Sequence, residues 1–133
     1  PLLDRIDIFT ETIILKYGEI SNSDKGENSY NVRKRIEKVH HIQKERYKND
    51  GILFNSELSA GIIKRYCVMD NEAKEYLENI FENMEFSARA YHKVLKTART
   101  IADMDESGEI KRKHISEAVC YRTADKKYWG VTM

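Results

Sequence analysis

The residues best suited to chemistry in this sequence are the cations of one predicted helix, residues 87–103. At about 100° of rotation per residue, this segment divides into an apolar side and a polar side. The apolar side comprises Tyr91, Val94, Leu95, Ala98, Ile101 and Ala102. The polar side comprises Arg89, His92, Lys93, Lys96, Arg99, Thr100 and Asp103. The spacing therefore predicts a helix with a buried apolar seam and a basic outer stripe.

Arg89 occupies an electrostatically unfavourable place in this predicted helix. Ser87 precedes the first turn, where its hydroxyl can accept a hydrogen bond from a free backbone N–H. A cation in that first turn is disfavoured by about 0.3–1 kcal/mol. Either a solvated Arg89 tolerates this cost, or Arg89 and the helix N-terminus together bind an anion such as phosphate. Residue types alone favour a solvated Arg89 that tolerates the cost.

Motifs for a complete active site are missing from the sequence. No GxxxxGK[ST] loop and no apolar strand ending in paired acids are present, so this chain cannot bind and hydrolyse a nucleotide in the P-loop manner. His40 and His41 point to different faces of a helix and form a poor metal site, and no HExxH or paired CxxC motif predicts zinc. We therefore expect no bound metal, no cofactor and no enzymatic activity in this chain alone.

Composition indicates one helical domain. The chain has 133 residues with only one proline and six glycines, which favours long helices. The net charge of +1 argues neither for nor against a nucleic-acid partner. No signal peptide, membrane-spanning run or CxxC pair is present, so we expect Cys67 and Cys120 to be buried free thiols in the cytoplasm. The chain opens without methionine, which suggests a piece of a longer protein.

The predicted elements are a strand followed by about five helices. Residues 6–15 are β-branched and partly alternating, which predicts a strand; it needs partners from a sheet outside this chain, or it packs on the helices. Residues 18–29 are polar and form a linker. The predicted helices span 30–47, a short segment from Ser56 or Ser59 to Tyr66, 71–83 capped by Asp70, 88–103, and 114–121. Residues 123–133 form a C-terminal tail that we expect to be loosely ordered.

The order of short motifs resembles a known family. These motifs are PLLDRID at residues 1–7, IQKER at 42–46, FNSEL at 54–58, SARAYH at 87–92, ARTIAD at 98–103 and HISEA at 114–118. The series is similar to the C-terminal part of magnesium-chelatase-like AAA+ ATPases of the ComM/YifB group. The resemblance implies that residues 1–17 end the AAA+ core and that residues 30–122 form the helical lid domain. Val68 departs from the family, which often has proline there.

The resemblance also implies roles for two arginines. Arg5 matches the arginine finger, which acts in trans on the nucleotide of the next subunit. Arg89 matches sensor 2, which reaches from the lid to the γ-phosphate. The implied partners are ATP and Mg²⁺ in the parent protein, the upstream core of the same chain, further copies in a homo-oligomer (expected to be a hexamer), and DNA. The other stripe cations are assigned to a solvated or interdomain face.

Three functions remain open at this point. The first is the lid and sensor module of an oligomeric AAA+ ATPase that couples ATP hydrolysis to DNA remodelling, as in ComM-like branch migration. The second is an ATPase module for insertion of Mg²⁺ into a porphyrin. The third is a stand-alone helical domain that binds DNA or a protein through its basic stripe. An upstream Walker A motif would exclude the third, and DNA-stimulated ATPase activity would separate the first two.

Overall fold

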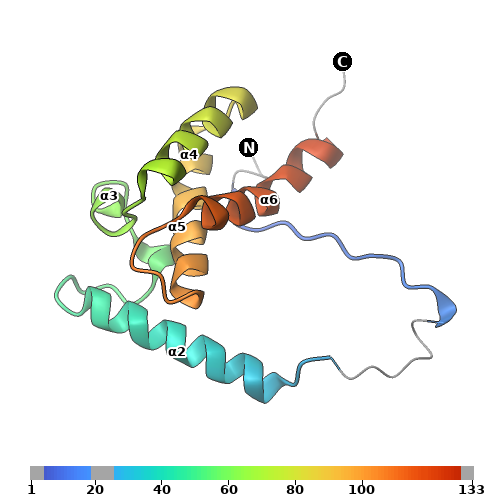
Figure 1. The fold of residues 1–133 in the computed structure, drawn as a ribbon, viewed down its shortest axis with the longest axis horizontal. Helices are drawn as coiled ribbons and strands as arrows, with labels where there is room; N and C mark the ends of the chain where they lie inside the picture. Colours follow the sequence, from blue (N-terminus) through green and yellow to red (C-terminus); the bar gives the residue numbers. More distant parts are fainter. Residues whose placement is uncertain (1–4, 19–25, 130–133) are drawn as a thin grey trace.

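The computed structural model describes residues 5–18 and 26–129, with side chains described as far as Arg122 (Figure 1). Its elements are α2 (Ser29–Tyr47), the 3-10 helix η2 (Asn55–Glu57), α3 (Ile63–Tyr66), α4 (Asn71–Met84), α5 (Ala88–Met104) and α6 (Arg112–Trp129). The protein is mainly helical, as the sequence predicts.

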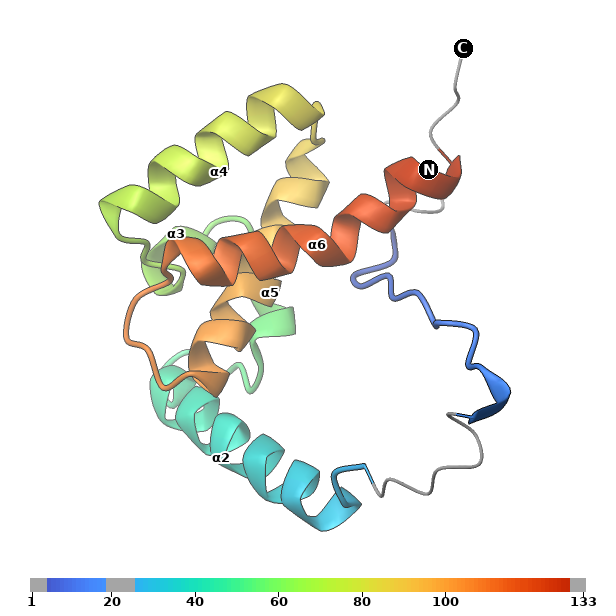
Figure 2. The ribbon, with the colours of Figure 1, turned by 45° about the vertical axis from the view of Figure 1, so that its right-hand side comes forward.

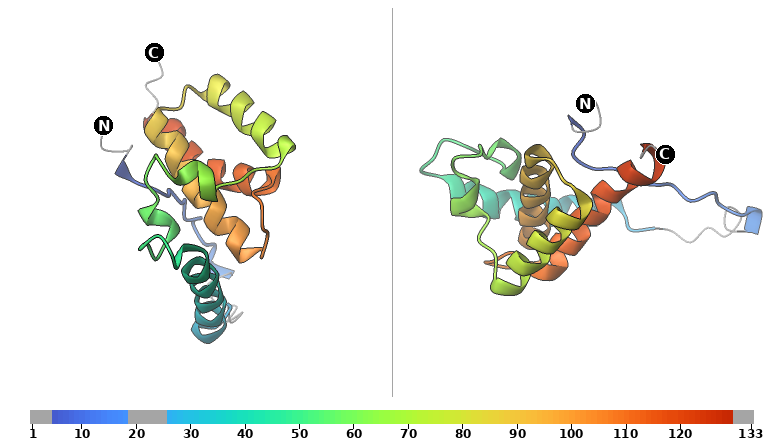
Figure 3. Two further views of the ribbon diagram at one scale, coloured as in Figure 1. Left: turned by 90° about the vertical axis from the view of Figure 1, so that its left-hand side faces the viewer. Right: turned by 90° about the horizontal axis from the view of Figure 1, so that it is seen from above.

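Helix α5 lies at the centre of the bundle. It packs against α6, α2, η2 and α3, while α4 packs against α6. Helices α2 and α4 lie at opposite ends of the bundle (Figures 1 and 2). Viewed from the side, the segment of residues 5–18 passes behind α5 and extends away from the helices (Figure 3). The predicted seam helix therefore organises the whole fold.

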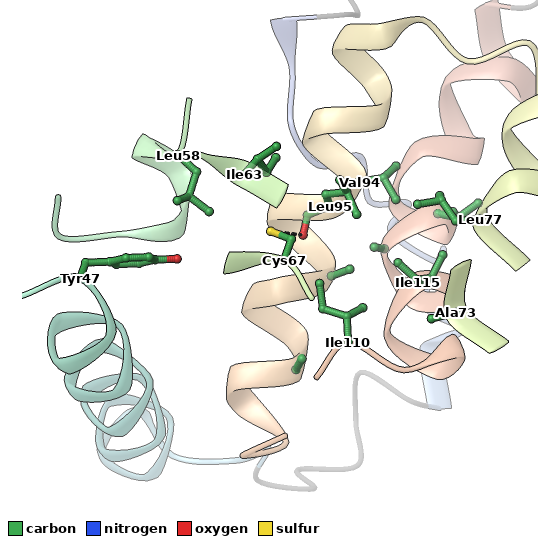
Figure 4. Close-up of a cluster of buried hydrophobic side chains, with 14 residues drawn as sticks. Tyr47, Leu58, Ile63, Cys67, Ala73, Leu77, Val94, Leu95, Ile110 and Ile115 are labelled. Atoms are coloured by element: carbon green, nitrogen blue, oxygen red, sulfur yellow. Dashed lines mark hydrogen bonds between the residues drawn. The ribbon is translucent and has the colours of Figure 1, made fainter. Parts of the chain in front are cut away.

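The core forms around the apolar seam of α5. Val94, Leu95, Ala98 and Ala102 are all buried. Side chains from the other elements surround them, namely Tyr47, Leu58, Ile63, Cys67, Ala73, Leu77, Ile110, Ile115, Ala118 and Val119 (Figure 4). Burial of these side chains is the main driving force for folding.

Two helices begin at the residues that the sequence predicts. The Ser87 hydroxyl accepts a hydrogen bond from the Ala90 N–H at 3.1 Å, and an Asp70 carboxylate oxygen accepts one from the Ala73 N–H at 2.8 Å. Each cap satisfies an N–H that has no partner within its helix. The local prediction of both helix starts is confirmed.

Three predicted elements differ from the structure. The predicted strand at residues 6–15 is not formed: Ile13 and Ile14 are 88% and 94% exposed, and the described part of the chain offers no neighbouring strand to pair with this segment. The predicted helix ending at Tyr66 is divided into η2 and α3, because Leu58 adopts an extended conformation that ends η2. Helix α6 continues to Trp129, so part of the predicted tail is helical. Most of the predicted linker 18–29 lies outside the described residues.

The two cysteines occupy different environments. Cys67 is buried, and its burial raises the pKa of the thiol to about 11, so the thiol is neutral at physiological pH. Cys120 is exposed on α6, where our expectation of burial was wrong. No helix among the described residues is long and apolar enough to cross a membrane.

Shortening a side chain on the apolar seam of α5 tests whether the predicted side of the helix faces the core. We expect Leu95→Ala to lower the free energy of unfolding by about 2–5 kcal/mol, because it leaves a cavity at a fully buried position. Urea denaturation followed by circular dichroism measures the change. Leu53→Ala is the matched control, since Leu53 is 56% exposed, and it should cost about 0.5 kcal/mol or less. Equal losses in the two variants would contradict the helix phase.

Candidate functional site

Arg89 is exposed in the first turn of α5, at the second residue of the helix. Within the described part of the chain, no hydrogen bond or ion pair engages its guanidinium. The side chain also lies off the apolar seam, so the fold does not depend on it. Arg89 is therefore available to an anion outside this chain, in a place where the helix dipole also attracts negative charge.

Arg5 is exposed at the first described residue, and the segment that follows it is attached to the helices. Asp7 pairs with Lys93 at 2.7 Å, and the Phe9 N–H donates a hydrogen bond to the Tyr121 carbonyl at 2.9 Å. The structure thus links the Arg5 segment to α5, one turn beyond Arg89. Asp4, which precedes Arg5, lies outside the described residues.

Arg122 of α6 also holds this segment. Its guanidinium donates a hydrogen bond to the Ile6 carbonyl and lies 5.4 Å from the centroid of the Phe9 ring. A guanidinium within about 6 Å of an aromatic ring is attracted by the negative face of the ring. Residues 6–9 are therefore fixed on α5 and α6, although they form no strand.

A groove of about 510 Å³ lies between this segment and the helices. Its lining mixes polar and apolar side chains, namely Asp7, Ile8, Thr10, Ser56, Lys93, Lys96, Thr97, Thr100, Ile101, Met104, Glu117 and Tyr121. The Lys96 ammonium donates to the Ser56 carbonyl at 2.8 Å, and Lys93 is paired with Asp7. Both lysines in the groove already have partners within the chain.

The predicted basic stripe of α5 is mostly an internal surface. Arg99 and Asp103 are each 1% exposed, so the assignment of Arg99 to a solvated or interdomain face was wrong. On the C-terminal half of α5, Asp103 contacts Arg46 of α2 and Asn55 of η2. Arg89 remains exposed among the stripe cations, whereas Lys93 and Lys96 are partly buried by their contacts.

Asp103 is the centre of a buried polar cluster that joins α2, η2 and α5. Both oxygens of its carboxylate accept hydrogen bonds from Arg46, one of them at 2.8 Å. The Arg99 Nε–H donates to one oxygen at 3.1 Å, and the Asn55 amide donates to the other at 2.9 Å. Two cations and one amide therefore surround a single buried carboxylate.

Asn55 and Arg99 extend the cluster. The Asn55 side-chain oxygen accepts a hydrogen bond from the Tyr47 hydroxyl at 2.5 Å, and the Asn55 N–H donates to the Gln43 side chain at 3.1 Å. Arg99 donates to the carbonyls of Ser107 and Gly108 at 2.6 and 2.9 Å. The cluster thus fixes both α2 and the loop that leads to α6.

The pKa values of the two arginines beside Asp103 shift in opposite directions. Burial alone lowers the pKa of Arg46, but the hydrogen bonds and negative charge of Asp103 outweigh it and raise the pKa overall. Deeper burial lowers the pKa of Arg99, although Asp103 opposes the change. Both guanidinium groups stay protonated at physiological pH, because an arginine side chain does not deprotonate in proteins, and both need the carboxylate as a partner.

Sequence analysis missed this cluster although its members lie within the quoted motifs. Arg46 ends IQKER, Asn55 belongs to FNSEL, and Arg99 and Asp103 belong to ARTIAD. The available signal was the pair of opposite charges four residues apart at Arg99 and Asp103, a spacing that places two side chains together on a helix. Several motif residues thus hold the domain together.

No group of three or more histidine, cysteine, aspartate or glutamate side chains among the described residues can hold a metal ion. The chemistry that the exposed arginines can perform is binding of oxyanions, because a guanidinium donates two parallel hydrogen bonds to a phosphate or carboxylate.

Comparisons with known proteins agree with this architecture. The family model "Magnesium chelatase, subunit ChlI C-terminal" matches residues 26–122. The protein YifB of Salmonella typhimurium is 37% identical over 127 residues, which are 95% of this chain and 24% of that protein. The competence protein ComM of Haemophilus influenzae is 37% identical over 123 residues, 92% of this chain and 23% of that protein.

A further relative, YifB of Escherichia coli K12, is 35% identical over 127 residues, 95% of this chain and 24% of that protein. The chain therefore spans about a quarter of the length of the curated relatives it matches. The matched residues include the whole helical bundle up to Arg122. This chain belongs to the family of magnesium chelatase ChlI C-terminal domains, in the form found in ComM and YifB proteins.

Proposed function

We propose that this domain is the lid and sensor module of an oligomeric AAA+ ATPase. In this proposal an upstream core of the same protein binds ATP and Mg²⁺, and the helical domain closes over the nucleotide. Arg89 acts as sensor 2 on the γ-phosphate, and Arg5 acts as an arginine finger on the nucleotide of the next subunit. The assembly is a homo-oligomeric ring, expected to be a hexamer, in the cytoplasm.

The observation that carries the proposal is that Arg89 is exposed and unpaired. Its guanidinium is exposed at the start of α5 and has no acidic partner among the described residues. The seam and the Asp103 cluster hold the rest of the helix rigidly. A rigid helix that presents a free cation and backbone N–H groups is suited to bind the charge of a phosphate. Membership of the family supports this assignment.

Substitution of Arg89 tests the sensor role. We expect Arg89→Ala in the full-length protein to lower the rate constant of ATP turnover by about 10²-fold, a typical loss for one donor to developing negative charge. The thermal midpoint should not change, because the side chain is exposed. A coupled phosphate-release assay measures the rate.

A second surface arginine provides the control for that experiment. Arg112 of α6 is exposed and pairs with Glu72 at 3.1 Å, an interaction of little energetic value. Arg112→Ala should therefore leave turnover unchanged. Turnover of Arg89→Ala equal to that of Arg112→Ala would exclude the sensor assignment.

The proposed work of the assembly is remodelling of DNA, as in branch migration. The ComM relative is named a competence protein, which supports a function on DNA. The family model carries the name of magnesium chelatase, which favours the alternative of Mg²⁺ insertion into a porphyrin. Stimulation of ATP turnover by branched DNA supports the first function, and stimulation by a porphyrin without any effect of DNA supports the second.

A further inference from the structure

The net charge of this chain is close to zero, but its positive and negative side chains are concentrated in different helices. Residues 29–48, which include α2, hold seven basic and two acidic side chains, a net of +5 with histidines neutral. Residues 70–85, which include α4, hold six acidic side chains and one basic one, a net of −5. These helices lie at opposite ends of the bundle (Figures 1 and 2). The domain is therefore an electric dipole with α2 as its positive end.

The cations of α2 are more available than those of α5. On α5, Lys93 and Lys96 have partners and Arg99 is buried. Arg89 alone is exposed and unpaired there, and the proposed function assigns it to the nucleotide. On α2, by contrast, Arg33, Lys34 and Lys44 are exposed, and no acidic side chain in the described residues pairs with them. Helix α2 thus carries three exposed, unpaired cations, whereas Arg89 is the one such lysine or arginine among the described residues of α5.

Helix α2 also has the shape of a projecting arm. Its buried residues are Val39, Gln43 and Tyr47, all in the C-terminal half that meets α5 and η2. The N-terminal half extends beyond the end of α5 into solvent (Figure 2). With 19 residues at 1.5 Å each, the helix is about 28 Å long.

The free cations lie on two flanks of this arm. Arg33 and Lys44 are separated by nearly whole turns and share one flank, while Lys34 lies about 100° round the helix. Lys38 is on the second flank as well, although it pairs with Glu106 at 2.6 Å. This distribution distinguishes two possible partners of α2. An acidic helix of another protein would contact only one narrow strip of its surface. The major groove of duplex DNA, which is lined on both sides by phosphates, contacts both flanks of an inserted helix.

We infer that α2 is a contact surface for the phosphate backbone of duplex nucleic acid. The inference rests on the proposed function and assigns its DNA contact to a particular helix. Duplex DNA carries one negative charge per about 1.7 Å of its axis, so a helix of this length spans many phosphates. The acidic α4 end is repelled by the same field, and the domain is therefore oriented with α2 toward the duplex.

The experiment compares two charge-reversal variants of the full-length protein. The test variant is Arg33→Glu/Lys34→Glu/Lys44→Glu. The control variant is Lys64→Glu/Lys74→Glu/Lys111→Glu, which changes the net charge equally at exposed lysines elsewhere. Fluorescence anisotropy with a labelled 30-base-pair duplex of random sequence measures the dissociation constant as a function of salt. Thermal melting confirms that both variants fold.

We expect the test variant to bind the duplex roughly tenfold or more weakly at physiological salt. The slope of log K against log[salt] should fall by about 2–3, since each phosphate contact contributes about 0.9. The control variant should keep the slope of the unsubstituted protein. Equal losses in the two variants, or retention of the slope by the test variant, would overturn the inference. Tighter binding of a polyglutamate peptide than of the duplex would also overturn it, in favour of an acidic protein partner.

ATP turnover separates this inference from the function on which it rests. The ratio of turnover with duplex to turnover without it should fall toward one in the test variant only. If the unsubstituted protein is stimulated by DNA and the test variant is stimulated equally, the inference fails and the proposed function stands. If DNA does not stimulate the unsubstituted protein, the proposed DNA function fails and the inference fails with it.

Discussion

Replacement of Arg5 by alanine is expected to lower ATP turnover of the assembled full-length protein by about 10³-fold or more. An arginine finger neutralises the charge that develops on the transferring phosphoryl group, and removal of such a finger costs 10³–10⁵ in related enzymes. Arg5 is exposed, so the substitution should not change the thermal midpoint of unfolding. The effect should appear in the rate constant for turnover, measured by phosphate release at saturating ATP.

Mixed assemblies test whether Arg5 acts across a subunit boundary. Subunits with Arg5→Ala retain their own nucleotide site but lack the finger for a neighbour. Subunits with a disabled upstream nucleotide site retain Arg5. Mixtures of the two should recover part of the turnover, because some interfaces then combine an intact site with an intact finger. Mixtures as inactive as either variant alone would contradict the action in trans.

The second large effect is expected at Asp103. We predict that Asp103→Ala lowers the free energy of unfolding by about 3–5 kcal/mol, since it leaves Arg46 and Arg99 without their counter-charge. The Arg99 side chain is 1% exposed and that of Arg46 is 18% exposed, so water cannot replace the carboxylate fully. Urea denaturation of the domain measures the loss.

One further variant separates the effect of charge from that of shape at Asp103, and a variant at Glu72 provides the control. Asp103→Asn keeps the volume but removes the charge, and it should recover only a minor part of the loss. Glu72→Ala breaks an exposed pair, since Glu72 is 67% exposed, and it should cost about 1 kcal/mol or less. A loss at Asp103 no larger than that at Glu72 would show that the cluster is not a major source of stability.

The Asp103 cluster also explains why Arg89 can be both exposed and well placed. The cluster lies toward the C-terminal end of α5, where Arg99 and Asp103 contact α2, η2 and the following loop. The middle of α5 is held by buried Val94 and Leu95. The N-terminal turn is thereby fixed in direction while its side chains remain free. In the proposed function this rigidity positions Arg89 for the phosphate.

Helix positions in this protein follow from short stretches of sequence. Asp70 and Ser87 are good N-cap residues, and each stands before a run of apolar residues at helical spacing. The bounds of α2, α4 and α5 could therefore be predicted to within about two residues. The same local logic identified Arg89 as a cation in an unfavourable first turn. The motif order identified the family.

Predictions from local residue spacing were wrong where the conformation or burial of a residue depends on contacts with distant parts of the chain. Residues 6–15 have the composition of a strand, but a strand requires a neighbour to accept its hydrogen bonds. Cys120 lies near apolar residues in the sequence, yet its side of α6 is exposed. In each case the missing information was which surface covers the residue.

The charged residues show this limit most clearly. Arg99 and Lys44 are both cations on the predicted polar side of a helix. Arg99 is buried because Asp103, Ser107 and Gly108 satisfy its donors, whereas Lys44 stays in water. Burial of a charge is tolerated only where partners compensate for the lost hydration. The sequence could show that Asp103 lies one turn from Arg99, but the carbonyls of Ser107 and Gly108 reach Arg99 only in the folded chain. Residue order therefore determined the helices, and tertiary packing determined which cations are structural and which are free to bind.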